Sequence, residues 1–335
     1  MSTLIESFDV VLADLDGVIY KGADSIPFAV DSINAAVADG VRVGYITNNA
    51  SRTAASVAEH LEELGLTVAA DDVVTSPQAG VRLLAEKVAA GSTILVVGGE
   101  GLTSVVEAAG FTVTHSQLDN PAAVIQGFAP EVGWAQLAEA AFALHEKDGE
   151  PGIPWIATNT DWTIPVARGI APGNGTLVSA VHTAVGRLPI VAGKPEIAMF
   201  DLAVERFSAK KAVVIGDRLD TDILGANRAG LESILVLTGI DKAKQVLAAE
   251  KSQRPTYIVD DLRGLHEPYP ETATTSEGSA TLTRVGDAIV RRDGENLTVD
   301  TAGESRINLL RAGAAAIWNS GVAIYGLRVS PELYS

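Results

Sequence analysis

The sequence contains no cysteine, and this absence excludes several kinds of site at once. Without thiols the chain cannot form disulfides, thiolate zinc sites, iron–sulfur clusters or a cysteine nucleophile. Aromatic residues are also scarce, at 5% of the chain, although 47% of its 335 residues are hydrophobic. We therefore expect a core built mainly from alanine, valine, leucine and isoleucine, large enough to need no disulfide.

Basic residues are few: 25 lysines and arginines stand against 42 aspartates and glutamates, which gives a net charge of −17. Because affinity for nucleic acids rests largely on contacts from Lys and Arg to phosphates, this balance argues against a nucleic-acid partner. No apolar run approaches the length of about 18 residues that a membrane span needs. The first residues also lack the basic segment of a signal peptide. These features predict a cytoplasmic protein with no membrane partner.

Short segments rich in Val and Ile alternate along the chain with longer segments rich in Ala, Leu and Glu. This alternation is typical of βαβ units and predicts an α/β fold with a doubly wound, mostly parallel sheet. The strands expected in this sheet are residues 8–13, 41–46, 72–76, 212–216, 233–237 and 257–259. Residues 80–188 show an alternation of their own, so we expect them to form an α/β domain inserted into a core of residues 1–79 and 189–270.

The composition changes after Pro270. Residues 271–279 are polar and are predicted to be a linker. Beyond them, alternating strand-like segments and a helical segment at 307–318 are followed by a last expected strand at 322–327. Residues 271–335 are therefore predicted to form a small C-terminal α+β appendage.

Two carboxylates follow the first predicted strand. Asp14 and Asp16 lie two positions apart, so in an extended chain their side chains point the same way. Open α/β sheets bind their ligands beyond the carboxyl ends of their strands. Gly17 permits the sharp turn that follows. The pair is a candidate for catalysis, although two acids that merely cap a strand end would look the same.

Polar groups also follow the second strand, at Thr47, Asn48 and Asn49, with Ser51 close behind. A hydroxyl, two amides and backbone N–H groups at a helix N-terminus form a neutral cradle for an anion. The alternative is an ordinary helix N-cap. Lys194, placed between Gly193 and a proline, could supply a cation to such an anion or could be an exposed surface lysine.

A third group of acids, Asp217, Asp220 and Asp222, comes directly after the strand at residues 212–216. Carboxylates this close repel each other unless a cation or solvent relieves them. Mg²⁺, which prefers oxygen ligands, is the most plausible cation. A solvated acidic loop at the start of a helix is the alternative, because acids suit the positive end of the helix dipole.

The four motifs occur in an order that resembles the haloacid dehalogenase superfamily. They are Asp14–Val18 (DLDGV), Thr47–Asn49 (TNN), Lys194 and Gly216–Asp222 (GDRLDTD), spread over residues 8–262. The long interval between Thr47 and Lys194 is similar to that of the C2-capped subfamily, which contains p-nitrophenyl phosphatases and phosphoglycolate phosphatases. The resemblance implies a Rossmann-like core and a C2 cap over residues 80–188 that selects the substrate.

The resemblance also implies the chemistry. Asp14 would attack phosphorus and form an aspartyl-phosphate, and Asp16 would act as general acid and base. The Asp14 carboxylate, the Asp16 carbonyl and Asp217 would bind Mg²⁺, with Asp222 behind them. The expected activity is hydrolysis of a small phosphorylated metabolite.

The phosphoryl oxygens would be held by Thr47, by the groups around Asn48 and Asn49, and by Lys194. In relatives an Asn-x-Asp loop of the cap faces the active site, so Asp161 is expected to contact the leaving group, unless it only ends a turn. Relatives often dimerise through their caps, and a homodimer of this kind is a further expectation.

The appendage resembles a fragment of an N-acetyltransferase fold, but it lacks the acyl-CoA pyrophosphate loop, so we expect it to be non-catalytic. A C2-capped phosphatase with such a tail is similar to bacterial glycerol 3-phosphate phosphatases, which makes glycerol 3-phosphate the first expected substrate. Phosphoglycolate, a sugar phosphate or a nucleotide remain open. So do phosphoryl transfer to an acceptor other than water and a non-catalytic sensor of a phosphorylated metabolite.

Overall fold

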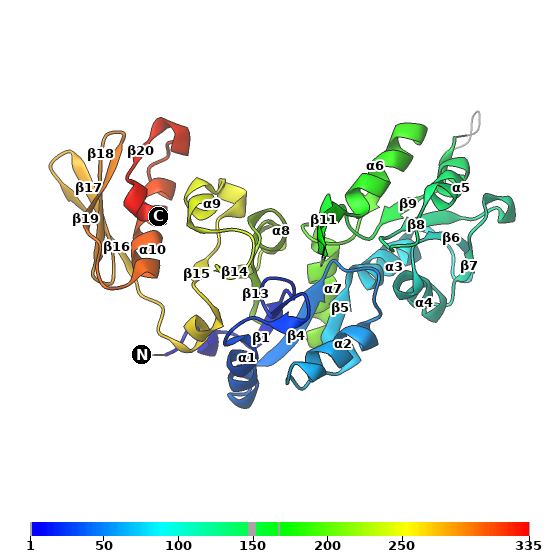
Figure 1. The fold of residues 1–335 in the computed structure, drawn as a ribbon, viewed down its shortest axis with the longest axis horizontal. Coiled ribbons are helices and arrows are strands. Elements are labelled where there is room, and N and C mark those ends of the chain that lie inside the picture. Colours follow the sequence, from blue (N-terminus) through cyan, green and yellow to red (C-terminus); the bar gives the residue numbers. More distant parts are fainter. Residues whose placement is uncertain (1, 147–151, 167, 335) are drawn as a thin grey trace. The chain divides into compact units, whose positions relative to one another are not determined.

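The computed structural model describes residues 2–146, 152–166 and 168–334 (Figure 1). It divides into two compact units. The first unit contains Met1–Lys21, Ser25–Arg42 and Lys210–Ser335, and the second contains Gly22–Asp24 and Val43–Ala209. None of the helices in the described part of the chain has both the length and the hydrophobicity that crossing a bilayer requires.

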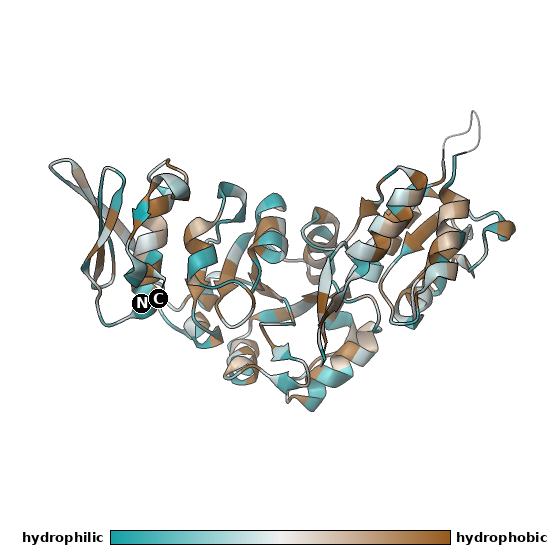
Figure 2. Cartoon of the chain, turned by 45° about the horizontal axis from the view of Figure 1, so that its top comes forward, coloured by the Kyte–Doolittle hydropathy of each residue, from teal (hydrophilic) through white to brown (hydrophobic). Residues whose placement is uncertain are grey.

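A parallel sheet forms the centre of the first unit. The strands that the first unit contributes to this sheet lie in the order β15 (Tyr257–Val259), β14 (Glu232–Val236), β13 (Ala212–Gly216) and β1 (Val10–Ala13). These strands are almost wholly buried hydrophobic runs, as expected for a sheet covered on both faces (Figure 2). The predicted α/β class with mostly parallel sheets is confirmed. The other elements of this region are β2 (Tyr20–Lys21), β3 (Asp24–Ser25), α1 (Ala29–Ala38), α8 (Leu224–Arg228) and α9 (Ala243–Ala248).

The C-terminal part of the first unit is a sheet covered by one helix. Helix α10 (Arg306–Trp318) packs on β17 and β18. Four strands pair in antiparallel order and a short fifth strand pairs in parallel with the fourth. They are β16 (Thr272–Glu277), β17 (Ala280–Val285), β18 (Ala288–Asp293), β19 (Asn296–Thr301) and β20 (Arg328–Val329).

Two predictions about this part were wrong. The predicted linker contains the edge strand β16, because its threonines favour an extended chain and six residues pair in register with β17. The predicted last strand at 322–327 instead holds a short helical turn at Ile324–Gly326, and the strand β20 comes after it.

The second unit contains a five-stranded parallel sheet. The strands lie in the order β12 (Ile190–Val191), β9 (Trp155–Ala157), β8 (Ala123–Gln126), β6 (Thr93–Val97) and β7 (Thr112–Thr114). A hydrophobic cluster joins β6, β8 and β9 to α5 and α6. The helices of this region are α3 (Ser76–Lys87), α4 (Glu100–Ala108), α5 (Trp134–Leu144) and α6 (Asn174–Val185).

The remaining elements of the second unit carry the TNN motif and a hairpin. Strand β4 (Arg42–Thr47) pairs in parallel with β5 (Val73–Thr75), so that Thr47 lies opposite Thr75. The strands β10 (Thr163–Val166) and β11 (Gly169–Pro172) form an antiparallel hairpin. Helices α2 (Ala54–Glu63) and α7 (Ile197–Phe207) complete the unit.

Candidate active site

Three buried carboxylates come together in the first unit. Asp14 directly follows β1 and Asp217 directly follows β13, and these two strands are adjacent and parallel. Asp222 lies in the helical turn Leu219–Ile223 that comes next. One oxygen from each of the three carboxylates lies within 4.8 Å of the others, and all three side chains are buried. Asp220 differs from them, because its side chain is exposed and pairs with Arg218 at 2.8 Å.

Glycines make room for the Asp217 carboxylate. Gly17 has a φ of +84°, which confirms the predicted sharp turn, and a Cβ there would lie 2.4 Å from Asp217 Oδ2. A Cβ on Gly239 would lie 1.8 Å from the same oxygen. Neither position therefore accepts a side chain while Asp217 stays in place.

Backbone groups orient the acids. The N–H of Ile240 donates to Asp217 Oδ2 at 2.6 Å, and the N–H of Arg218 donates to Asp222 Oδ2 at 3.2 Å. Asp16 lies in the turn after Asp14 and is exposed, so it can exchange a proton with solvent.

The TNN turn of the second unit is held by its own side chains. Thr47 is buried at the end of β4, and its Oγ1 accepts the N–H of Asn49 at 3.1 Å. Asn49 Oδ1 accepts both the N–H and the hydroxyl of Ser51 at 2.9 Å. Helix α2 begins only at Ala54, with Thr53 as its N-cap.

The helix N-terminus expected directly behind the TNN motif therefore lies further along the chain, at Thr53. Asn and Ser side chains compete with the helix for backbone N–H groups, and this competition delays the helix by several residues. The N–H groups of Asn49 and Ser51 donate inside the turn.

Asn48 connects three segments of the second unit. Its side-chain Nδ2 donates to the Lys194 carbonyl at 3.1 Å, and its Oδ1 accepts the Lys194 N–H at 2.8 Å. Nδ2 also lies 3.2 Å from both carboxylate oxygens of Asp161. The Asn48 carbonyl accepts the Ser76 hydroxyl at 2.8 Å and the Asn159 amide at 2.7 Å. The side chain of Asn48 thus fixes Lys194 and the Asp161 loop.

Lys194 is buried rather than exposed, with 4% of its surface accessible. A buried ammonium needs compensating charge or hydrogen bonds, and such a lysine is well suited to receive an anion. The structure therefore brings Asn48, Lys194 and Asp161 together in the second unit, as it brings Asp14, Asp217 and Asp222 together in the first.

Comparisons with known proteins decide the family. The family model for haloacid dehalogenase-like hydrolases matches residues 11–112, and a second model of the same kind matches residues 191–265. The D-glycerol 3-phosphate phosphatase of Mycobacterium tuberculosis is 41% identical over 324 residues, which are 96% of this chain and 89% of that protein. The chain belongs to the haloacid dehalogenase-like hydrolases.

Solved structures and a further relative agree with this family. The glycerol phosphate phosphatase of M. tuberculosis in complex with magnesium has a TM-score of 0.84 at 39% identity, covering 98% of this chain and 95% of that chain. A p-nitrophenyl phosphatase from Archaeoglobus fulgidus has a TM-score of 0.69 at 26% identity, covering 77% and 98%. An acid sugar phosphatase of Staphylococcus aureus (strain USA300) is 32% identical over 77% of this chain and 96% of that protein.

The acid cluster of this hydrolase fits a magnesium ion. Three buried negative charges within 4.8 Å of one another are strongly unfavourable without a cation, because burial weakens the screening by water. Carboxylate oxygens are the ligands that Mg²⁺ prefers, and Mg²⁺ commonly uses one or two of them together with water and substrate oxygens. The donor set therefore suits this metal.

Sequence reasoning missed some supporting residues of the hydrolase. Asp241 Oδ2 accepts the N–H of Leu219 at 2.7 Å, and burial raises the pKa of this carboxyl above its ordinary value. The sequence signal that could have identified Asp241 was its position as an acid after β14, a third strand of the same sheet. Ser76 and Asn159 hold the Asn48 carbonyl, and no local motif marks Ser76 for that task.

Proposed function

We propose that this hydrolase is a Mg²⁺-dependent phosphomonoesterase whose substrate is glycerol 3-phosphate. The observation that carries the proposal is the cluster of Asp14, Asp217 and Asp222 beyond the ends of adjacent strands. The substrate is supported by the relative named D-glycerol 3-phosphate phosphatase, which matches nearly the whole chain.

The proposed reaction has two steps. In the first, a carboxylate oxygen of Asp14 forms a bond to phosphorus while the ester P–O bond breaks, and Asp16 gives its proton to the leaving alcohol oxygen. In the second, Asp16 takes a proton from a water molecule whose oxygen attacks phosphorus. Inorganic phosphate leaves and the Asp14 carboxylate is restored.

We assign the metal to the carboxylates of Asp14 and Asp217 and the carbonyl of Asp16, with Asp222 close to them. When bound, Mg²⁺ would neutralise negative charge on the phosphoryl group and on the attacking carboxylate. Asp217 is oriented for this task by the Ile240 N–H, and Asp222 by the Arg218 N–H.

We assign the phosphoryl oxygens to Thr47, Asn48, Asn49 and Lys194. The Thr47 hydroxyl accepts one N–H and can still donate its own hydrogen. The Lys194 ammonium supplies the positive charge, and the side chain of Asn48 fixes the Lys194 backbone at both polar groups. Asp161 is proposed to contact the leaving group, with its carboxylate oriented by Asn48.

We further propose the division of labour among the parts of the chain. Residues 1–79 and 189–270 carry the chemistry, residues 80–188 form the cap that selects the substrate, and residues 271–335 form a non-catalytic appendage. The lack of cysteine suits a reducing compartment, which supports a cytoplasmic location.

We also propose a homodimer through the cap. The β10–β11 hairpin and the residue before it expose large apolar side chains: Trp162, Val166 and Ile170 are 65%, 48% and 74% exposed. Neighbouring exposed apolar side chains often mark an interface. Sedimentation velocity of the parent and of Ile170→Glu tests this: a dimer that becomes a monomer in the variant supports the proposal, and a monomeric parent overturns it.

A phosphate-release assay tests the activity. Purified protein with Mg²⁺ is incubated with glycerol 3-phosphate, phosphoglycolate, sugar phosphates and nucleotides, and the Asp14→Asn variant serves as the blank. The highest kcat/KM is expected for glycerol 3-phosphate, with one phosphate released per ester consumed. Release below that ratio would indicate transfer to another acceptor, and binding without release would indicate a sensor.

A further inference from the structure

The hydrophobic core of the first unit runs without interruption into the appendage. One cluster of buried side chains contains residues from the parallel-sheet region and residues from the appendage. The first group includes Leu219, Ile223, Val246 and Leu247, and the second includes Leu297, Leu309, Leu310 and Ile317. Because close-packed interiors transmit strain, we expect a change in the packing of α10 to reach α9.

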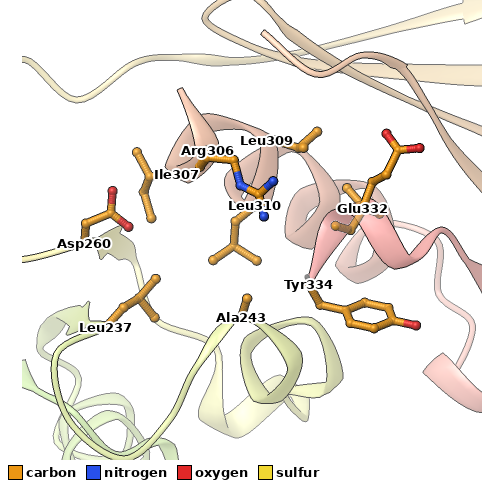
Figure 3. A pocket seen from close by; sticks show the side chains of 10 residues that line it. Leu237, Ala243, Asp260, Arg306, Ile307, Leu309, Leu310, Glu332 and Tyr334 are labelled. Carbon is orange, nitrogen blue, oxygen red and sulfur yellow. The ribbon is translucent and has the colours of Figure 1, made fainter. Parts of the chain in front are cut away.

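The contact between α10 and α9 is direct. A Cβ on Gly313 of α10 would lie 3.5 Å from Leu247 Cδ2 on α9. Leu310, one turn earlier on α10, lines a small cavity of about 100 Å³ together with Leu237 and Ala243. Figure 3 shows Leu310 pointing from α10 toward Ala243, where α9 begins.

Leu237 and Ala243 are the two ends of the loop at residues 237–243. Between these ends the Ile240 N–H donates to Asp217 Oδ2, and the Thr238 hydroxyl donates to the Gly17 carbonyl at 2.6 Å. The loop therefore orients the Asp217 carboxylate. The position of this loop depends on how its end residues, Leu237 and Ala243, are packed.

The same cluster also holds the turn that carries Asp222. Leu219 and Ile223 flank this acid and are 5% and 0% exposed, so their burial in the cluster fixes the turn between them. The Leu219 N–H is bonded to Asp241 of the 237–243 loop. The positions of Asp217 and Asp222 thus both depend on packing that includes residues of the appendage.

We propose that Leu310 is a positioning residue for the magnesium site. Leu237 and Ala243 pack against the cluster that contains Leu310, and in this way Leu310 keeps the 237–243 loop, and with it Asp217, in the arrangement that binds the metal. The proposal rests on the metal assignment made above. It gives the appendage a part in the active site without placing any appendage residue in contact with substrate.

Calorimetric titration of the chelator-treated full-length protein with Mg²⁺ tests the proposal directly. Leu310→Ala removes the side chain that lines the cavity beside the loop ends, and Leu297→Ala removes a leucine of the same cluster from β19, in the sheet on which α10 packs. Loss of supporting interactions around metal ligands typically weakens affinity by about 10–100-fold. We expect about tenfold weaker Mg²⁺ binding by Leu310→Ala. Leu297→Ala should bind like the parent. Equal affinity in both variants, whether at the parent's level or below it, overturns the proposal.

Steady-state kinetics and milder variants complete the test. In Leu310→Ala the Mg²⁺ concentration for half-maximal rate should rise, while KM for the ester at saturating Mg²⁺ stays unchanged. Leu310→Met, which conserves volume, should restore the parent's Mg²⁺ affinity, and failure of that rescue counts against the proposal. If Leu310→Ala does not fold, Leu310→Val is compared with Leu297→Ala. A parent that binds Mg²⁺ but hydrolyses no ester would overturn the proposed function alone.

Discussion

The side-chain amide of Asn48 pairs with both backbone polar groups of Lys194. Its Oδ1 accepts the Lys194 N–H at 2.8 Å, and its Nδ2 donates to the Lys194 carbonyl at 3.1 Å. The same Nδ2 faces the Asp161 carboxylate. Only an amide of this length offers a donor and an acceptor in that arrangement, so Asn48 fixes the backbone of the buried lysine.

Asn48→Asp should therefore impair both stability and activity. The substitution keeps the shape but replaces the donor by an oxygen that faces the Lys194 carbonyl and the Asp161 carboxylate. Unsatisfied buried polar groups cost about 1–3 kcal/mol, so the free energy of unfolding should fall by about that amount. Displacement of Lys194 should lower kcat/KM by at least about tenfold, since about 1.4 kcal/mol corresponds to that factor.

A double variant distinguishes the two effects of Asn48→Asp, which are repulsion of the Asp161 carboxylate and displacement of Lys194. Asn48→Asp combined with Asp161→Asn restores a donor between these two positions, so the free energy of unfolding should partly recover. Activity should stay low, because the Lys194 carbonyl still faces an oxygen. Parent-level kcat/KM in the single Asn48→Asp variant would contradict this account.

Asp14→Asn should abolish turnover and leave the fold intact. An amide is a poor nucleophile, and losses on removing a nucleophile reach about 10³-fold or more in kcat. Without metal the variant should unfold at a higher temperature than the parent, because one of three mutually repelling carboxylates is gone. Phosphate release and thermal denaturation in EDTA measure the two effects. Asp220→Asn, at an exposed acid of the turn that also carries Asp222, is the matched control and should keep the parent's kcat.

Removal of the metal should stop hydrolysis reversibly. EDTA is expected to abolish phosphate release, and excess Mg²⁺ to restore it. A ligand that binds only the folded state at 100 times its Kd adds about 2.7 kcal/mol of stability, so Mg²⁺ should also raise the melting temperature. In Asp217→Asn this increase should shrink or vanish. Hydrolysis that persists in EDTA would exclude the proposed metal role.

The sequence was sufficient to find the acids because their signals are local. Asp14 and Asp217 each follow a hydrophobic strand directly, and parallel strands bring their carboxyl ends to one edge. The family resemblance then gave each of these motifs an expected role in one reaction. The elements of the sheet were predictable for the same reason, since buried parallel strands are continuous apolar runs.

The contacts of Asn48 could not be predicted in this way. Its side chain bonds to residues 113 and 146 positions away, and no periodicity or spacing reports such pairs. The strand β16 was missed because its polar threonines look like a linker, and only pairing with β17 decides for a strand. The shared core of α9 and α10 likewise depends on tertiary packing, which local propensity does not contain.

Acidic pH should weaken the hydrogen bonds between Asp9 and the backbone of Lys210 and Lys211. The Asp9 carboxylate accepts the N–H groups of Lys210 and Lys211 at 2.8 and 2.9 Å. Partial burial raises the pKa of Asp9, but these hydrogen bonds outweigh it and hold the pKa below its ordinary value of 3.8. A carboxyl with a depressed pKa contributes stability above its unfolded pKa and loses that contribution as pH falls through the folded value.

Urea unfolding of Asp9→Asn and the parent checks this sign. At pH 7 the variant should be less stable by about 1 kcal/mol or less, because the group is largely exposed. The difference should be constant down to about pH 5 and should shrink below the ordinary pKa of the carboxyl. A difference that grows as the pH falls would contradict the assignment.

Removal of residues 271–335 should unfold the first unit, although every candidate catalytic residue remains. The deletion uncovers Leu247 and its neighbours in the shared cluster, and it removes Arg311, whose Nε and Nη2 donate to the Ile258 carbonyl of β15 at 2.9 and 2.6 Å. Buried leucines are worth about 2–5 kcal/mol each, and the net stability of a domain is only about 5–15 kcal/mol. Circular dichroism of the truncated chain should therefore show lost cooperativity of unfolding.

The matched control keeps the appendage but cuts the chain at a protease site inserted after Pro270. The nicked protein should elute as one particle with the parent's melting temperature, because the cluster still holds its two parts together. A truncated chain that melts like the parent would mean that this packing stabilises only the appendage.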